Sequence, residues 1–102
     1  MNREILLENG YKEWEPNIFH ETASLMYQKR FRNEKGQTMY FITIYEYEHE
    51  VEPNYEVELQ FEQNNYVMNI TLFAFKDNMT LQDIESTVYK IWYVFDCKYY
   101  EE

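Results

Sequence analysis

One segment of regular alternation, from Tyr55 to Glu62, constrains the fold of this chain most strongly. Its odd positions are apolar and its even positions are polar: Tyr55, Val57, Leu59 and Phe61 alternate with Glu56, Glu58, Gln60 and Glu62. Successive side chains of a β-strand point to opposite faces of a sheet, so this pattern predicts a strand with one buried and one solvated face.

Three further segments have strand character. Ala23–Arg32 alternates, Thr38–Glu48 is rich in β-branched and aromatic residues, and Tyr66–Phe75 alternates again. The connections near Gly36 and Asn65 have turn composition, since both residue types tolerate positive φ. Such short connections imply antiparallel neighbours, and we expect a four-stranded meander.

Helical patterns lie at both ends of the chain. Asn2–Glu8 predicts a short helix stopped by Asn9-Gly10. A longer helix is predicted after Thr80, which has capping-box spacing to Asp83. Its apolar stripe consists of Leu81, Ile84, Val88, Ile91, Trp92 and Phe95.

The predicted fold class is therefore α+β. We expect one domain over residues 1–102: a four-stranded antiparallel β-meander with the C-terminal helix packed on one face and a short N-terminal helix. Residues 11–22 contain several aromatic side chains and Pro16, and we interpret them as an irregular crossover held to the body by its rings.

The charge is strongly negative and unevenly spread. Nine Lys plus Arg against nineteen Asp plus Glu give −10, which disfavours direct nucleic-acid binding and anionic membrane surfaces and favours basic partners. Between Gly36 and Phe75 there are seven Glu and no Lys or Arg. We interpret this span as the most informative part of the chain.

The single cysteine and the N-terminal composition favour a cytoplasmic protein. Cys97 has no second cysteine for a disulfide or a C-x-x-C metal site. The apolar stretch Ile5–Leu7 is too short for a signal peptide, and no run is long enough to span a membrane.

The usual catalytic signatures are missing from the sequence. With only Gly10 and Gly36 the chain has no glycine-rich phosphate loop, and neither Ser24 nor Ser86 occurs in a nucleophile elbow. Cys97 lies beside Asp96 after the predicted helix and not at a helix N-terminus, where reactive cysteines are found. We expect no catalytic residue, no cofactor and no enzymatic activity.

Metal binding is also not expected. His49 is surrounded by glutamates, but strand alternation points it away from its even-numbered neighbours. His20 and His49 match no metal-ligand spacing such as H-E-x-x-H.

The acidic span supplies the candidate binding surface. Residues two apart on a strand lie roughly 6.6 to 6.8 Å apart on one face, so Glu46/Glu48 and Glu56/Glu58 are expected to form regular charge rows that imitate a nucleic-acid backbone. The candidate partner-binding residues are Tyr45, Glu46, Tyr47, Glu48, Glu56, Glu58 and Glu62. The alternative is a solvated sheet face whose charges prevent edge pairing.

A basic cluster follows the first predicted strand into its turn. The cluster consists of Lys29, Arg30, Arg32 and Lys35, and most of it is expected to lie on the surface. The alternatives are that these residues form cross-strand pairs or make the molecule dipolar, which would favour head-to-tail self-association.

Three short motifs resemble small uncharacterised acidic proteins encoded by phages and prophages. They are Asn9-Gly10-Tyr11-Lys12, Tyr27-Gln28-Lys29-Arg30-Phe31 and Tyr99-Tyr100-Glu101-Glu102. The resemblance implies an inhibitor of a host factor rather than an enzyme, and it transfers no catalytic residue to this chain.

The sequence thus predicts a non-catalytic protein-interaction module. Its acidic, Tyr-bearing sheet surface would bind a basic, nucleic-acid-handling host protein, as a phage-type inhibitor does. Two alternatives stay open. One is a small enzyme or ligand-binding domain with a pocket between sheet and helix, and the other is a self-assembling structural subunit such as a homodimer.

Overall fold

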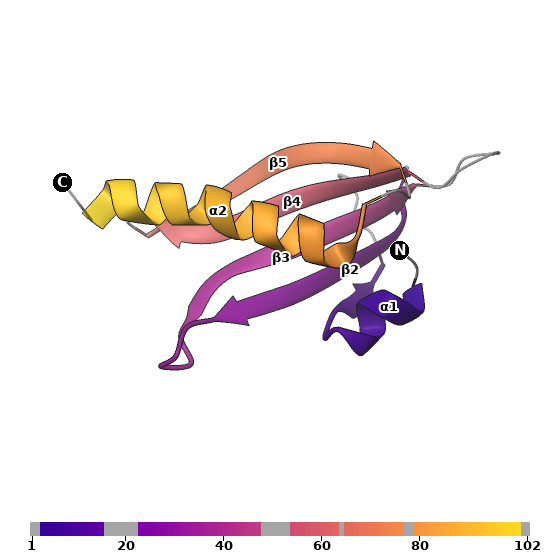
Figure 1. The fold of residues 1–102 in the computed structure, drawn as a ribbon, viewed down its shortest axis with the longest axis horizontal. Helices are drawn as coiled ribbons and strands as arrows, with labels where there is room; N and C mark the ends of the chain where they lie inside the picture. The colour runs from indigo at the N-terminus through magenta and orange to yellow at the C-terminus, as the bar shows by residue number, and fades with distance from the viewer. Residues whose placement is uncertain (1–2, 16–22, 48–53, 64, 77–78, 101–102) are drawn as a thin grey trace.

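The chain folds into a five-stranded antiparallel sheet with a long helix on one face (Figure 1). The structure is a computed structural model that describes residues 3–15, 23–47, 54–63, 65–76 and 79–100. The elements are α1 (Arg3–Glu8), β1 (Lys12–Trp14), β2 (Ala23–Arg32), β3 (Thr38–Tyr47), β4 (Asn54–Gln63), β5 (Tyr66–Lys76) and α2 (Leu81–Tyr100). Their order across the sheet is β1-β2-β3-β4-β5, which confirms the predicted α+β class and the meander.

The predicted number of strands is wrong, because the sheet has a fifth strand, β1. Lys12–Trp14 pairs with β2, and Glu13 lies opposite Tyr27. Three residues are too few for alternation to be visible in the sequence, so the segment was predicted as part of an irregular crossover. The expected anchoring by an aromatic ring is confirmed for Tyr11, which is 2% exposed, whereas Trp14 is 50% exposed.

The predicted turns occur where the backbone needs positive φ. Gly36 has φ of 80° in the β2–β3 turn, and Asn65 has φ of 68° between β4 and β5. Asn33 stabilises the first of these turns, since its side-chain oxygen accepts hydrogen bonds from the backbone N–H groups of Lys35 and Gln37. Gly10 has φ of 90° and ends α1 as expected.

The core lies between the sheet and α2. Val57 and Leu59 of β4 and Ile84 and Val88 of α2 are fully buried, which confirms the alternation and the helical stripe. Burying each such side chain contributes about 1.5 to 3 kcal/mol. The Thr80 hydroxyl accepts a hydrogen bond from the Asp83 N–H at 3.1 Å and caps the helix.

The C-terminal helix is longer than expected. Helix α2 continues to Tyr100. Cys97 therefore lies within the helix, and the prediction that it follows the helix is wrong. None of the described helices is both long and apolar enough to cross a membrane.

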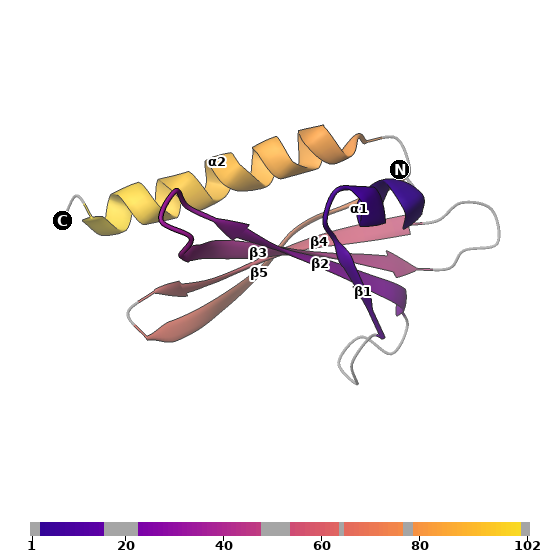
Figure 2. The same cartoon turned by 90° about the horizontal axis from the view of Figure 1, so that it is seen from below.

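The sheet divides into two hairpins at one end. The β3–β4 pairing runs only as far as Phe41 opposite Gln60. Beyond this pair, 38–40 of β3 pairs with β2 alone and 61–63 of β4 pairs with β5 alone, and the two hairpins diverge (Figure 2). Aromatic rings of α2 pack against both branches, with Trp92 5.1 Å from Tyr40 and Phe95 5.7 Å from Phe61 between ring centroids.

Candidate functional site

The face of the sheet turned away from the core carries five of the seven predicted binding residues. Tyr27, Ile44 and Val57 are opposite one another and buried, so their sequence neighbours project to the other side. We call the second side the open face, because no described helix covers it (Figure 2). Its described members include Lys12, Trp14, Met26, Gln28, Arg30, Arg32, Phe41, Thr43, Tyr45, Tyr47, Glu56, Glu58, Gln60, Glu62, Val67, Asn69 and Thr71.

Three of the predicted glutamates form one row along β4 on the open face. Glu56 and Glu58 are half-buried and Glu62 is exposed. The Tyr47 hydroxyl donates a 3.5 Å hydrogen bond to Glu56. Burial, together with this carboxylate, raises the pKa of Tyr47. The structure therefore brings Tyr47 and the β4 glutamates into one surface.

Tyr45 also lies on this face, opposite Glu56, but its side chain does not protrude. It is 3% exposed. Burial, and then the nearby Glu58, raise the pKa of Tyr45 to about 12. Tyr45 thus forms the floor of the open face, and a partner would contact the groups around it.

One of the predicted residues, Glu46, does not join this surface. Glu46 is opposite Tyr55 and projects to the core side, where it accepts a 3.1 Å hydrogen bond from the Tyr55 hydroxyl. Glu48 lies outside the described residues. The carboxylates at 46 and 56 therefore belong to opposite faces of the sheet.

The open face also carries cations, which sequence reasoning did not assign to the site. Lys12 of β1 is opposite Gln28, and Arg30 of β2 is opposite Phe41, with its guanidinium 5.6 Å from the centre of that ring. The sequence contained evidence for this placement, because Gln28, Arg30 and Arg32 are each two residues apart and so point to the same face of their strand. The open face is thus basic on β1 and β2, aromatic on β3 and acidic on β4.

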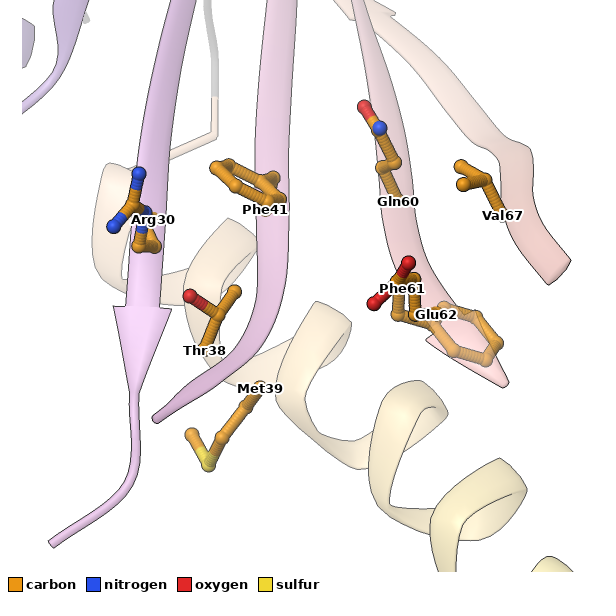
Figure 3. A pocket seen from close by; sticks show the side chains of 8 residues that line it. All are labelled: Arg30, Thr38, Met39, Phe41, Gln60, Phe61, Glu62 and Val67. Carbon is orange, nitrogen blue, oxygen red and sulfur yellow. The ribbon is translucent and has the colours of Figure 1, made fainter. Parts of the chain in front are cut away.

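A cavity of about 390 Å³ opens where the two hairpins diverge (Figure 3). It is lined by Arg30, Thr38, Met39, Phe41, Gln60, Phe61, Glu62 and Val67. Arg30 and Glu62 bring one charge of each sign to its wall, and Phe41 supplies an apolar surface between them. A cavity of this composition suits a side chain of a protein partner better than an anionic ligand.

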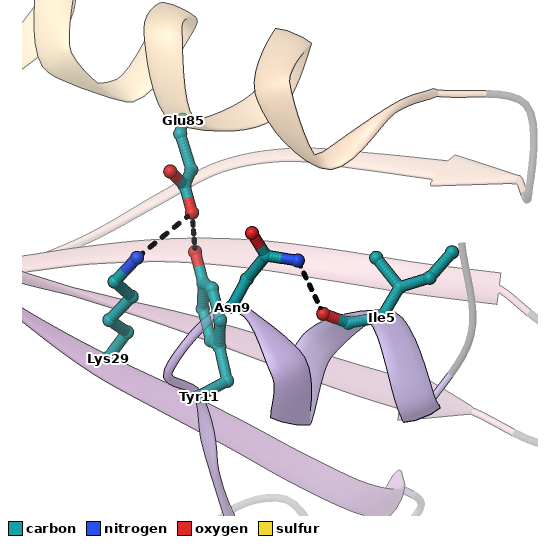
Figure 4. Close-up of polar contacts among 5 residues, drawn as sticks. All are labelled: Ile5, Asn9, Tyr11, Lys29 and Glu85. Atoms are coloured by element: carbon teal, nitrogen blue, oxygen red, sulfur yellow. Dashed lines mark hydrogen bonds and ion pairs between the residues drawn. The ribbon is translucent and has the colours of Figure 1, made fainter.

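A second polar cluster lies on the core side, at the flank of α2 (Figure 4). The Tyr11 hydroxyl donates a hydrogen bond to Glu85 at 3.1 Å, and Lys29 lies 3.7 Å from the same oxygen. The Lys29 ammonium also lies 4.9 Å from the centre of the Phe31 ring. Beside the cluster is an open groove of about 690 Å³ that includes Glu85, Tyr40 and Tyr89.

The polar groups at α2 are therefore at its edge and not in an enclosed chamber. The groove is lined by residues of both the sheet and α2, among them Phe31, Tyr40 and Leu81, and the apolar core lies next to it. In the described part of the chain, no three His, Cys, Asp or Glu side chains gather as a metal site would require. His20 and His49 lie outside that part.

Comparison with known proteins gives no relative from which a role could be transferred. No family model, curated protein or solved structure matches the chain.

Proposed function

We propose that the protein is a non-catalytic interaction module that binds a basic protein through the acidic side of its open face. The observation that carries this proposal is the row Glu56, Glu58 and Glu62 on β4, in a span from Gly36 to Phe75 that contains no Lys or Arg. Glu56 and Glu58 are two residues apart and are separated by roughly 6.6 to 6.8 Å, and Glu62 lies about twice as far from Glu58. Like charges so close together repel one another, and a cationic partner relieves that repulsion.

Apolar groups beside the row support a protein as the partner. Tyr47 adjoins Glu56, Trp14 is 50% exposed at the β1 edge, and the cavity at Phe41 can receive a side chain. Aromatic rings next to charges are typical of protein interfaces, where they provide most of the contact energy.

The partner class that fits best is a protein that itself binds nucleic acid. A groove built to bind phosphates presents Lys and Arg side chains at intervals that a row of carboxylates can meet. The charge of −10 argues against direct binding of nucleic acid by this chain. The resemblance to small phage proteins supports the role of a cytoplasmic inhibitor acting on such a host protein.

The test is capture of proteins from a bacterial lysate by the immobilised chain, in low and in high salt. Glu58→Lys/Glu62→Lys reverses the row, and Glu8→Lys/Glu34→Lys makes the same charge change at exposed positions away from the open face. We expect the wild type and the control to retain basic proteins that high salt or duplex DNA releases, and the row variant to lose them.

Capture that is equal for both variants would contradict the proposal, as would partners that are acidic or insensitive to salt. Circular dichroism of each variant distinguishes a lost surface from a lost fold.

A further inference from the structure

The charges of the open face follow an order that makes the face complementary to itself. Arg30 and Arg32 lie on β2, Glu58 and Glu62 on β4, and β3 with Phe41 runs between them. The positions are fixed by register, since Arg30 is opposite Phe41 and Phe41 is opposite Gln60, which lies between the two glutamates in the row.

We propose that the open face binds the open face of a second copy of this chain, around a two-fold axis parallel to β3. Rotation about such an axis places β2 of each copy over β4 of the other. Arg30 of one copy then lies over Gln60 of the other, within reach of Glu58 and Glu62. A two-fold axis perpendicular to the strands would instead place β2 over β2 and oppose like charges, so the charge order selects one arrangement.

The remaining contacts of this arrangement are apolar. Phe41 and the accessible part of the Tyr47 ring lie near the axis, so each contacts the same residue of the second copy. The two sheets would pack about 10 Å apart, as the sheets of a β-sandwich do. Trp14 and Val67, which are 50% and 54% exposed, lie toward opposite edges and become partly covered. Because each copy carries −10, overall repulsion weakens the pair, and we expect a reversible dimer that dissociates on dilution.

This inference goes beyond the proposed function. It depends on Arg30 and Arg32 of β2, which have no part in the proposed binding of a basic protein. The two are linked by Glu58 and Glu62, which serve both surfaces. A dimer of this kind hides the acidic row, so self-association and partner binding exclude each other on the open face.

The test is sedimentation of two charge-reversed variants, alone and mixed. Arg30→Glu/Arg32→Glu leaves both sides of the face acidic, and Glu58→Lys/Glu62→Lys leaves both sides basic. We expect each variant to be monomeric at concentrations where the wild type is dimeric. Their equimolar mixture should form a heterodimer, because β2 of each variant then opposes the opposite charge on β4 of the other.

Net charge alone does not produce that rescue. Each substitution changes the charge by two units, so the variants carry −14 and −6 and still repel overall. Glu8→Lys/Lys35→Glu, at exposed positions outside the face, serves as the matched control and should dimerise like the wild type.

Three results would overturn the inference: a wild type that stays monomeric at every concentration, variants that dimerise like the wild type, or a mixture that remains monomeric. The outcome is separable from the proposed function. Arg30→Glu/Arg32→Glu should lose the dimer yet capture basic proteins at least as well as the wild type, since it keeps the acidic row and adds to it.

Discussion

The Tyr11 hydroxyl donates a hydrogen bond to the carboxylate of Glu85, 74 residues further along the chain. This bond joins the segment between α1 and β1 to the helix α2, and Lys29 of β2 lies 3.7 Å from the same carboxylate oxygen. Burial, and then the charge of Glu85, raise the pKa of Tyr11 above its ordinary value, so the hydroxyl remains a donor across the usual pH range.

Tyr11→Phe removes the donor and keeps the ring. A hydrogen bond to a charged group contributes about 1.5 to 3 kcal/mol, and because Glu85 keeps Lys29 nearby we expect a loss of about 1.5 kcal/mol in the free energy of unfolding. Urea denaturation measures it. Tyr89→Phe, at a ring that is 45% exposed, is the control and should change little. Equal stability of both variants would show that the bond contributes nothing.

Leu59→Ala should lower the free energy of unfolding by about 2 to 5 kcal/mol, because Leu59 is fully buried and the truncation leaves a cavity between β4 and α2. Leu59→Asp should leave the chain unfolded, since it buries an unpaired charge. Ile91→Asp should destabilise less, because Ile91 is only half-buried. Thermal unfolding followed by circular dichroism provides the ranking, with the exposed Thr71→Ala as control. A Leu59→Ala variant as stable as that control would remove the core assignment.

Tyr27→Phe should stabilise the protein. The Tyr27 side chain is fully buried, and its hydroxyl has no hydrogen-bond partner among the described residues. A buried polar group without a partner costs about 1 to 3 kcal/mol, so removing the oxygen should raise the free energy of unfolding by about 1 kcal/mol. Chemical denaturation of Tyr27→Phe and Tyr11→Phe measures the free energy of unfolding of both variants. The same loss of a hydroxyl group should raise this free energy at Tyr27 and lower it at Tyr11. A destabilised Tyr27→Phe would show that the hydroxyl is satisfied in solution.

Alkaline pH should unfold the protein through its buried tyrosines. Burial raises the pKa of Tyr27, Tyr40 and Tyr45 from 10.0 to about 12 in each case. A raised pKa means that the folded state holds the proton more tightly than the unfolded state. The resulting stability is fully present below pH 10 and is lost as the pH rises through about 12.

Urea midpoints at several pH values in that window measure the loss, and tyrosinate absorbance shows whether the late ionisation coincides with unfolding. Tyr27→Phe/Tyr40→Phe should make the fall shallower, because two of the shifted groups are removed. A midpoint that does not change through the window would contradict the expectation.

Much of the fold was predictable because its signals are local. The alternation at Val57 and Leu59 and the helical spacing of Ile84 and Val88 each identify a buried face from a few consecutive residues. The positive φ of Gly36 and Asn65 likewise follows from the residue type. The strand β1 was missed because its three residues have no pattern of their own and become a strand only by pairing with β2.

The candidate site was predictable only in part. Alternation placed Glu56, Glu58 and Glu62 together, but it could not show that Glu46 faces the core side or that Tyr45 is buried on the open face. Those properties depend on which strands are neighbours and on what the neighbouring side chains cover.

The four long strands, the turns, the capped helix and the acidic row could be identified from the sequence alone, since side-chain period, backbone preference and charge are properties of short segments. Three features became visible only in the folded chain: Arg30 shares a face with Glu62, the sheet divides beyond Phe41, and Tyr11 meets Glu85. The physical reason is that register and packing join residues far apart in the chain, and their free energy depends on all the strands and the helix together.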